Sequence, residues 1–329
     1  MLYDSLMIDF ACAHDKPPKP KLSNRLRISM TISNTRPKSK SDLFSMFGLL
    51  VGCILFGLGS LIVAHIETVG AYAMAFWRLL ISTGIFLVLA KIFGQHFPTN
   101  KKAIGFALIS GAALGLDLAL WHESIYAIGP GISTLLNSLQ IFFLAFIAFL
   151  WFGERQTKMQ LLSLVMASVG VALIASPEFA HNDAALWGFV SGIASGAFLA
   201  ISMAYIRRTH EVVRVPILPM MTIVGAGGAL TMLPMMLLWN WGQIMPTTMS
   251  EWGWVFVYGA VMQCMAWGLI AYSIPKLALS MTGLLLLSEP VAALLIDYFW
   301  LHKAISGLQW GGAFLVMFAI YLGSLKARN

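Results

Sequence analysis

Residues 73–102 read AMAFWRLLISTGIFLVLAKIFGQHFPTNKK, an apolar run of about 20 residues that leads into a polar segment with lysines. A helix rises about 1.5 Å per residue, so a run of this length crosses a hydrocarbon core of about 30 Å. The whole chain is 59% hydrophobic and only 11% charged, whereas about a quarter of the residues in a soluble domain are charged. The sequence therefore predicts a helical membrane protein.

Ten apolar stretches of this kind are predicted to cross the membrane. The segments between them alternate between rich and poor in Lys and Arg, and an excess of these residues marks the cytoplasmic side. With the N-terminal tail inside, 19 of the 21 Lys and Arg residues are cytoplasmic, Lys303 is outside and Arg78 lies within a helix. We therefore expect an all-α, multi-pass protein of the cell membrane with both termini in the cytoplasm. The predicted spans are residues 43–64, 73–93, 103–122, 130–152, 158–175, 184–206, 215–239, 252–272, 279–301 and 304–325.

Residues 1–42 form a basic tail that we expect to be disordered, because its Lys-, Pro- and Ser-rich composition cannot supply a packed core. The tail has no apolar segment long enough for a cleavable signal peptide, and either Met1 or Met30 can be the start. The net charge of +7 lies in the tail and loops and so does not indicate nucleic acid. Anionic lipid headgroups are the expected partners, and the alternative is a solvated tail without a partner. Three isolated cysteines predict neither a metal site nor a disulfide framework, and no cofactor is expected.

The chain also overlays on itself. A shift of 150 positions places Leu135–Ile141 over Leu285–Val291 and aligns the fourth span with the ninth. Each half, residues 43–175 and 184–325, then holds five spans, and an odd number means that the second half enters the membrane in the opposite orientation. Inverted repeats of this type are a common architecture of secondary transporters.

Three short patterns carry a resemblance to a known family. Phe76–Leu80, the stretch from Trp121 to Arg155, and Leu287–Val291 resemble the two EamA repeats of the drug/metabolite transporter superfamily. The resemblance implies a ten-helix permease of two inverted five-helix EamA repeats, which usually exports metabolites, amino acids or xenobiotics. Gln140 stands where the family often has proline, and His302-Lys303 where a Gly-Glu pair is usual, so the resemblance itself does not predict a kink in the fourth span.

Arg78 is the basic residue that falls well inside a predicted span, whereas Lys91 and Lys158 lie at the ends of theirs. A charge at the centre of a membrane helix costs about 2.5–3.5 kcal/mol, so it needs a partner, a cavity or a route to the interface. One interpretation makes Arg78 a clamp for a substrate carboxylate. The other makes it a structural charge that extends to the interface or pairs with Glu67 or Glu123.

Asp117 and Trp121 are spaced to share one face of the third span. A carboxylate beside an indole suits an amine or cationic substrate. In the alternative, Asp117 is satisfied by Arg78 or a hydroxyl group, and Trp121 anchors the helix at the interface.

Glu289, beside Pro290 in the ninth span, is the deepest acid. Its carboxyl group is a candidate carrier of a coupling proton. The alternative is a permanently protonated acid that hydrogen-bonds Ser288 or a neighbouring helix and holds the kink.

Amides and aromatic rings on other spans complete the predicted substrate site. Such groups can bind a small molecule without the cost of burying a charge, but they can equally join one helix to another. They are Asn137, Gln140, Gln263 and Trp267, with Tyr205 at the end of the sixth span. Glycines at every fourth position, such as Gly188, Gly192 and Gly196, predict close helix packing.

Three classes of function make different demands on the sequence. A secondary transporter fits the repeat, with protons as a candidate coupling ion, whereas a membrane sensor would not need a repeat. An integral-membrane enzyme that modifies lipids would need clustered acids, histidines or a nucleophile, and the seven histidines are scattered in or beside separate loops. No phosphate-binding loop motif occurs, so we expect a transporter that is neither an enzyme nor driven directly by ATP.

Overall fold

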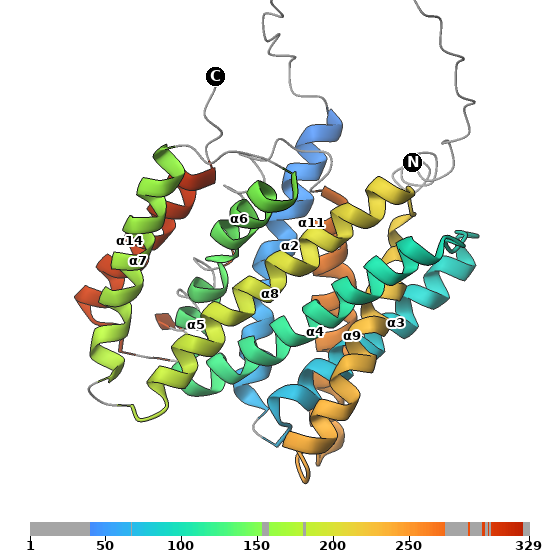
Figure 1. Ribbon diagram of the computed structural model, residues 1–329. Coiled ribbons are helices and arrows are strands. Elements are labelled where there is room, and N and C mark those ends of the chain that lie inside the picture. Colours follow the sequence, from blue (N-terminus) through green and yellow to red (C-terminus); the bar gives the residue numbers. More distant parts are fainter. Residues whose placement is uncertain are drawn as a thin grey trace, which may run out of the picture. The chain divides into compact units, whose positions relative to one another are not determined.

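The computed structural model describes residues 40–66, 68–152, 158–179, 182–273, 289, 298–299, 302 and 304–324. These residues form helices and turns, and none of them belongs to a β-strand (Figure 1). The elements are α2 Lys40–His65, α3 Ala71–Ile92, α4 Lys101–Ile128, α5 Pro130–Asn137, α6 Gln140–Phe152, α7 Lys158–Phe179, α8 Ala185–Val212, α9 Ile217–Trp239, α10 Met249–Val257, the π-helix η1 Tyr258–Ala266, α11 Trp267–Ser273 and α14 Gly307–Ser324.

Seven segments of the described chain are long and apolar enough to cross a membrane. They correspond to the first four predicted spans and to the sixth, seventh and eighth. The apolar cores of the fifth and tenth spans are shorter, at Leu161–Ile174 and Gly307–Ala319. Most of the ninth span, including Pro290, Ser288 and the 279–288 segment, lies outside the described residues. The multi-pass helical class is confirmed, while the number ten stays a prediction.

The third predicted span is longer than expected. Asn100 begins α4 by accepting hydrogen bonds from the backbone N–H groups of Lys102 and Ala103, which is a standard N-cap. The helix then continues to Ile128, where Gly129 with φ +88° ends it. The expectation that this helix ends at residue 122 is wrong, because no breaking residue occurs before Gly129. As a result His122 is a fully buried helical residue and not a loop residue.

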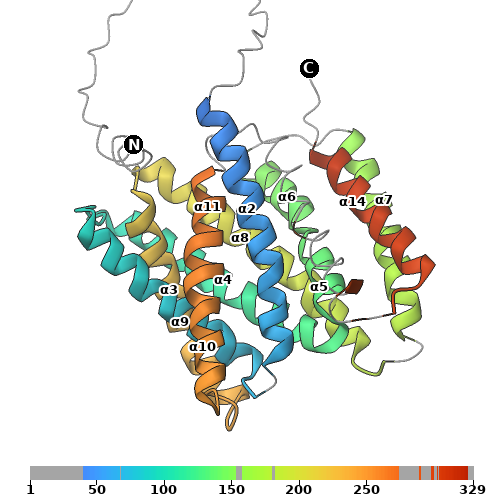
Figure 2. The same cartoon turned by 180° about the vertical axis from the view of Figure 1, so that it is seen from behind.

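The two halves of the chain pack closely against each other. α4 contacts both α8 and α9, α3 packs along α9, and α2 packs along η1 and α11 on the other side of the bundle (Figures 1 and 2). The third helix of one half therefore meets the first helix of the other half in both directions, as expected for two halves related by a two-fold axis. The pair α7 and α14, the fifth and last spans, also pack against each other.

Glycines make these close contacts possible. A Cβ atom at Gly196 of α8 would lie 2.6 Å from the carbonyl oxygen of Asn137, and one at Gly52 of α2 would lie 2.8 Å from that of Ala266. Gly192 likewise faces Ser124 and Leu136. Real Cβ atoms do not approach other atoms so closely, so these positions need glycine. The prediction that the regularly spaced glycines serve close packing is confirmed for these helices.

Candidate functional site

Arg78 of α3 lies in the main hydrophobic core with 1% of its surface exposed. Its Nε donates a hydrogen bond of 2.7 Å to Oε1 of Gln263, and its Nη1 donates to the hydroxyl group of Tyr258. The rings of Phe56 and Tyr258 contact the guanidinium carbon at 4.6 and 4.5 Å. The cation is therefore bonded to neutral groups and covered by aromatic rings.

One expectation for Arg78 is corrected by this burial. A side chain with 1% exposure does not extend to the membrane interface, so that structural interpretation is wrong. The proposed partner Glu123 instead accepts a hydrogen bond of 3.0 Å from the indole of Trp187. Glu67, the other proposed partner, lies outside the described residues.

The π-helix η1 explains how two residues of one helix reach Arg78. Tyr258 and Gln263 are five positions apart, and in an α-helix five positions correspond to a rotation of about 140°. A π-helix has hydrogen bonds from residue i to i+5, which brings such a pair close to one face. Both side chains are buried, at 0% and 3% exposure, and both accept hydrogen bonds from Arg78.

Tyr258 also links Arg78 to His122 of α4. The Tyr258 hydroxyl lies 2.8 Å from Nε2 of His122, whose Nδ1 lies 3.1 Å from the carbonyl oxygen of Ala71. A carbonyl only accepts, so Nδ1 carries a proton. In a neutral imidazole Nε2 then accepts from Tyr258, which in turn accepts from Arg78. Arg78, Tyr258, His122 and the Ala71 carbonyl thus form a series of hydrogen bonds, in which each group donates to the next.

Asp117 of α4 and Asn137 of α5 form a second buried pair. Nδ2 of Asn137 donates hydrogen bonds of 2.8 Å both to Oδ1 of Asp117 and to Oγ of Ser195 on α8. These bonds tie three helices together. The carboxyl groups of Asp117 and Glu289 both lie within electrostatic range of the Arg78 guanidinium, so the pair belongs to the same polar region.

The fourth span is interrupted beside this pair. α5 ends at Asn137 and α6 begins at Gln140, and the Ser138 hydroxyl bonds back to the carbonyl of Thr134 at 2.9 Å. The break is present although Gln140 replaces the proline that is frequent in the resembling family. Close contact with Gly196 accompanies it. Interrupted helices expose backbone polar groups inside the membrane, which substrate sites of transporters often use.

Phe56 of α2 connects the two tryptophans of the predicted site. Its ring centroid lies 6.0 Å from those of Trp121 and Trp267. Among the described residues, the indole N–H groups of both tryptophans, Nη2 of Arg78 and Oε1 of Gln140 are buried without a hydrogen-bond partner. Each buried unsatisfied polar group costs about 1–3 kcal/mol. A bound molecule would satisfy such groups.

Most of the predicted site residues therefore come together. Arg78, Trp121 and Trp267 lie around Phe56, and Gln263 bonds to Arg78. Asp117 and Asn137 bond to each other within electrostatic range of Arg78. Gln140 begins α6 next to this pair, and its role stays a prediction, as do the roles of the others.

The prediction missed Phe56, His122, Ser195 and Tyr258. His122 and Tyr258 carry a sequence signal, because both are large polar groups within apolar stretches. Ser195 is one of several small hydroxyl residues in such stretches, and Phe56 has no polar group, so neither stands out.

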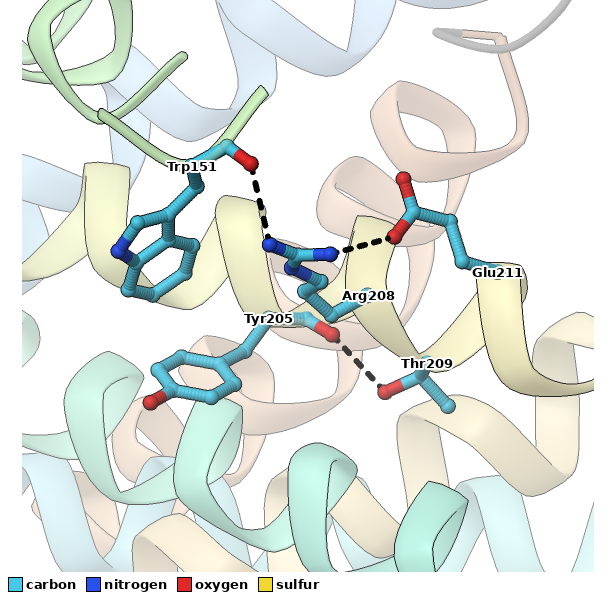
Figure 3. Close-up of polar contacts among 5 residues, drawn as sticks. All are labelled: Trp151, Tyr205, Arg208, Thr209 and Glu211. Atoms are coloured by element: carbon cyan, nitrogen blue, oxygen red, sulfur yellow. Dashed lines mark hydrogen bonds and ion pairs between the residues drawn. The ribbon is translucent and has the colours of Figure 1, made fainter. Parts of the chain in front are cut away.

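Tyr205 is part of a different site. Its ring centroid lies 5.2 Å from that of Trp151 (Figure 3). It also lies 5.7 Å from that of Phe106, where α4 begins and where α6 and α8 end. Arg208 of α8 donates to the carbonyl oxygen of Trp151 at 3.2 Å and pairs with Glu211 at 3.1 Å. These residues, with Lys102 and Val212, line a pocket of about 330 Å³. The expectation that Tyr205 lines the central site is wrong.

A larger pocket of about 780 Å³ lies at the opposite end of the bundle, where α2, α4 and α9 end and α3 and α5 begin. Asn240 closes one side of it. Its Oδ1 accepts hydrogen bonds from the backbone N–H groups of Tyr72 and Ala73 at 2.9 and 3.1 Å, and so caps α3. Ala71, which receives the His122 bond, also lines this pocket. Within the described part of the chain, no three His, Cys, Asp or Glu side chains gather as metal ligands.

These features define a multi-pass helical membrane protein with a buried polar site between two packed halves. The family model of the EamA-like transporter family matches residues 43–176 and 186–325, so the chain belongs to this family, within the drug/metabolite transporter superfamily, and has its two-repeat architecture. Protein PecM of Dickeya dadantii (strain 3937) is 24% identical over 248 residues, 73% of this chain and 78% of PecM. A solved crystal structure aligns with 86% of this chain over 96% of its own length, at a TM-score of 0.56 and 15% sequence identity. This similarity supports the fold.

Proposed function

We propose that the protein is a secondary transporter that moves a small metabolite, amino acid or xenobiotic out of the cell by alternating access. The observation that carries the proposal is the burial of Arg78. This residue is a fully buried cation inside a membrane helix, held by neutral groups of the other half of the chain. Such a charge costs about 2.5–3.5 kcal/mol at a helix centre, and intramembrane charges of this kind usually mark substrate or ion pathways.

The orientation in the membrane is part of the proposal. The end of the bundle where α4 begins carries Lys101, Lys102 and Arg208, and the opposite end carries Glu123 and Glu251. By the positive-inside rule the first end faces the cytoplasm. With ten helices, both termini lie on that side.

Alternating access needs a barrier at each end. At the proposed cytoplasmic end the bond between Arg208 and Trp151 joins the second repeat to the first. At the outer end Asn240 joins α9 to the start of α3. Rocking of one repeat against the other would break one barrier while the other holds, as in other inverted-repeat transporters.

Glu289 is the proposed proton carrier. Its carboxyl group is within electrostatic range of Arg78 and Asp117, so a change in its charge would be felt in the substrate site. If it carries the coupling proton, Glu289→Gln abolishes uphill transport driven by a pH gradient and leaves downhill exchange.

The test is metabolite profiling of cells and medium with and without the protein, followed by proteoliposome uptake of each compound that shifts. We expect wild-type protein to shift at least one compound, Arg78→Gln to abolish the shift and the exposed charge variant Lys91→Gln to retain it. The proposal is rejected if no compound shifts, or if Arg78→Gln moves the same compound at the wild-type rate.

A further inference from the structure

We infer that the ligand of the central site is an aromatic organic anion whose carboxylate binds Arg78, Trp121 and Trp267. The inference rests on the proposed function, because it names the chemistry of the substrate of that same site. It starts from the hydrogen-bond donors that the protein leaves unused.

Three of these donors gather around one ring. Nη2 of Arg78 and the indole N–H groups of Trp121 and Trp267 are buried without a partner among the described residues. Their side chains are 1%, 3% and 5% exposed. All three contact Phe56: the guanidinium carbon lies 4.6 Å and each indole centroid 6.0 Å from its ring centroid. The side chains that carry these donors come from α3, α4 and α11 and all lie beside Phe56 of α2.

The type of atom determines what can satisfy these groups. A guanidinium or indole N–H only donates, so its partner must be an acceptor. A carboxylate accepts several hydrogen bonds at once, and its bonds to a guanidinium are stronger than those between neutral groups. A ligand with an amine in this position would add a fourth donor and leave the three unsatisfied.

The neutral hydrogen-bond partners of Arg78 also favour an anionic ligand. Arg78 bonds to the neutral atoms of Gln263 and Tyr258, and in the described part of the chain no carboxylate forms an ion pair with it. Asp117, the predicted partner of a cationic substrate, has Oδ1 engaged by Asn137. The carboxyl groups of Asp117 and Glu289 lie within electrostatic range of Arg78 but do not bond to it in the described part of the chain, so the guanidinium can bind the carboxylate of a ligand directly.

The aromatic rings next to these donors indicate the rest of the ligand. The rings of Phe56 and Tyr258 contact the Arg78 guanidinium, and the other two unused donors belong to the rings of Trp121 and Trp267, which lie beside Phe56. Aromatic pairs gain energy from stacked or edge-to-face contacts beyond the burial of their area. A planar aromatic group attached to the carboxylate fits these walls better than a flexible or sugar-like group.

The inference is tested by calorimetric titration of the purified protein in lipid nanodiscs. The probes are benzoate, 3-phenylpropionate and indole-3-propionate, each compared with the amine of the same skeleton. We expect at least one acid to bind at least tenfold more tightly than its amine, and Arg78→Gln to weaken that binding at least tenfold. Trp121→Phe and Trp267→Phe, which keep a ring but remove the N–H, should each weaken it several-fold. Trp241→Phe, at a tryptophan that is 79% exposed, is the matched control and should bind as wild type.

Equal or tighter binding of the amines, no binding of any acid, or wild-type affinity in both tryptophan variants would overturn the inference. The two tryptophan variants keep it testable if Arg78→Gln does not fold. Uptake of another compound without acid binding rejects the ligand class and leaves the transporter proposal intact. Acid binding without transport of any compound supports the ligand class and rejects the transporter proposal.

Discussion

Nε of Arg78 donates a hydrogen bond of 2.7 Å to Oε1 of Gln263, although the two residues are 185 positions apart and belong to different repeats. The bond lies in the buried core, between α3 and the π-helix η1. The same contact therefore joins the two halves and sets the position of the cation in the site. Variants at Arg78 and Gln263 can therefore alter stability, ligand binding or both.

Gln263→Glu should separate charge from structure. The new carboxylate would still accept from Arg78 Nε, and it would neutralise the cation by an ion pair. We expect a thermal midpoint close to that of wild type and at least a tenfold loss of proteoliposome uptake. Gln263→Leu, which leaves the donor unpaired, should instead cost about 1–3 kcal/mol of stability. Wild-type uptake by a folded Gln263→Glu variant would contradict the role of the Arg78 charge.

Tyr258 and His122 should be energetically coupled. Tyr258→Phe removes the hydroxyl that joins Arg78 to His122, and His122→Ala removes the imidazole that accepts from this hydroxyl. In a double-mutant cycle of unfolding free energy we expect non-additivity of at least about 0.5 kcal/mol. Ser163, which bonds to its own helix α7, supplies the control: Ser163→Ala with Tyr258→Phe should be additive. Additivity of the Tyr258 and His122 variants would mean that the hydrogen-bonded residues Arg78, Tyr258 and His122 do not act as a unit.

The sequence predicts the fold better than it predicts the site. Apolar length and the alternation of basic loops depend on local composition, so they indicated the helices and the membrane without any tertiary contact. The site depends on contacts between distant positions. Arg78, Trp121 and Gln263 were each proposed as polar or aromatic residues in apolar spans. Nothing in the sequence indicated that Arg78 and Gln263 bond to each other.

Three local features explain the remaining differences. Tyr258 and Gln263 are not on one face of an α-helix, so their joint contact with Arg78 depends on a π-helix that the apolar pattern does not reveal. Phe56 is one phenylalanine among 21 and has no distinguishing neighbour. The interruption after Asn137 occurs without proline at the break, and it coincides with two contacts that no local sequence pattern reveals, the Ser138 bond to the Thr134 carbonyl and the close approach of Gly196.

Gly196→Ala should destabilise the interrupted fourth span. The added Cβ would lie 2.6 Å from the Asn137 carbonyl and 3.1 Å from the Gln140 nitrogen, both backbone atoms that cannot move independently. Overpacking of this type typically costs about 1–3 kcal/mol. The control is Gly253→Ala in α10, where the Cβ would meet nothing within 4 Å. Thermal unfolding in detergent should show a loss for Gly196→Ala and no loss for Gly253→Ala, and equal midpoints would show that close approach at Gly196 is unnecessary.

Arg208→Gln should open the end of the bundle where α4 begins. The variant loses the guanidinium that donates to the Trp151 carbonyl and pairs with Glu211. We expect a cysteine placed at Phe106, in the pocket beside Tyr205, to react several-fold faster with an impermeant maleimide in the Arg208→Gln background. The measurement uses inside-out vesicles after replacement of the native cysteines, and Lys91→Gln is the charge-matched control. If this end is cytoplasmic, right-side-out vesicles should show no labelling. An unchanged rate in Arg208→Gln would mean that the Trp151 contact is not a barrier, and labelling from the outside alone would reverse the proposed orientation.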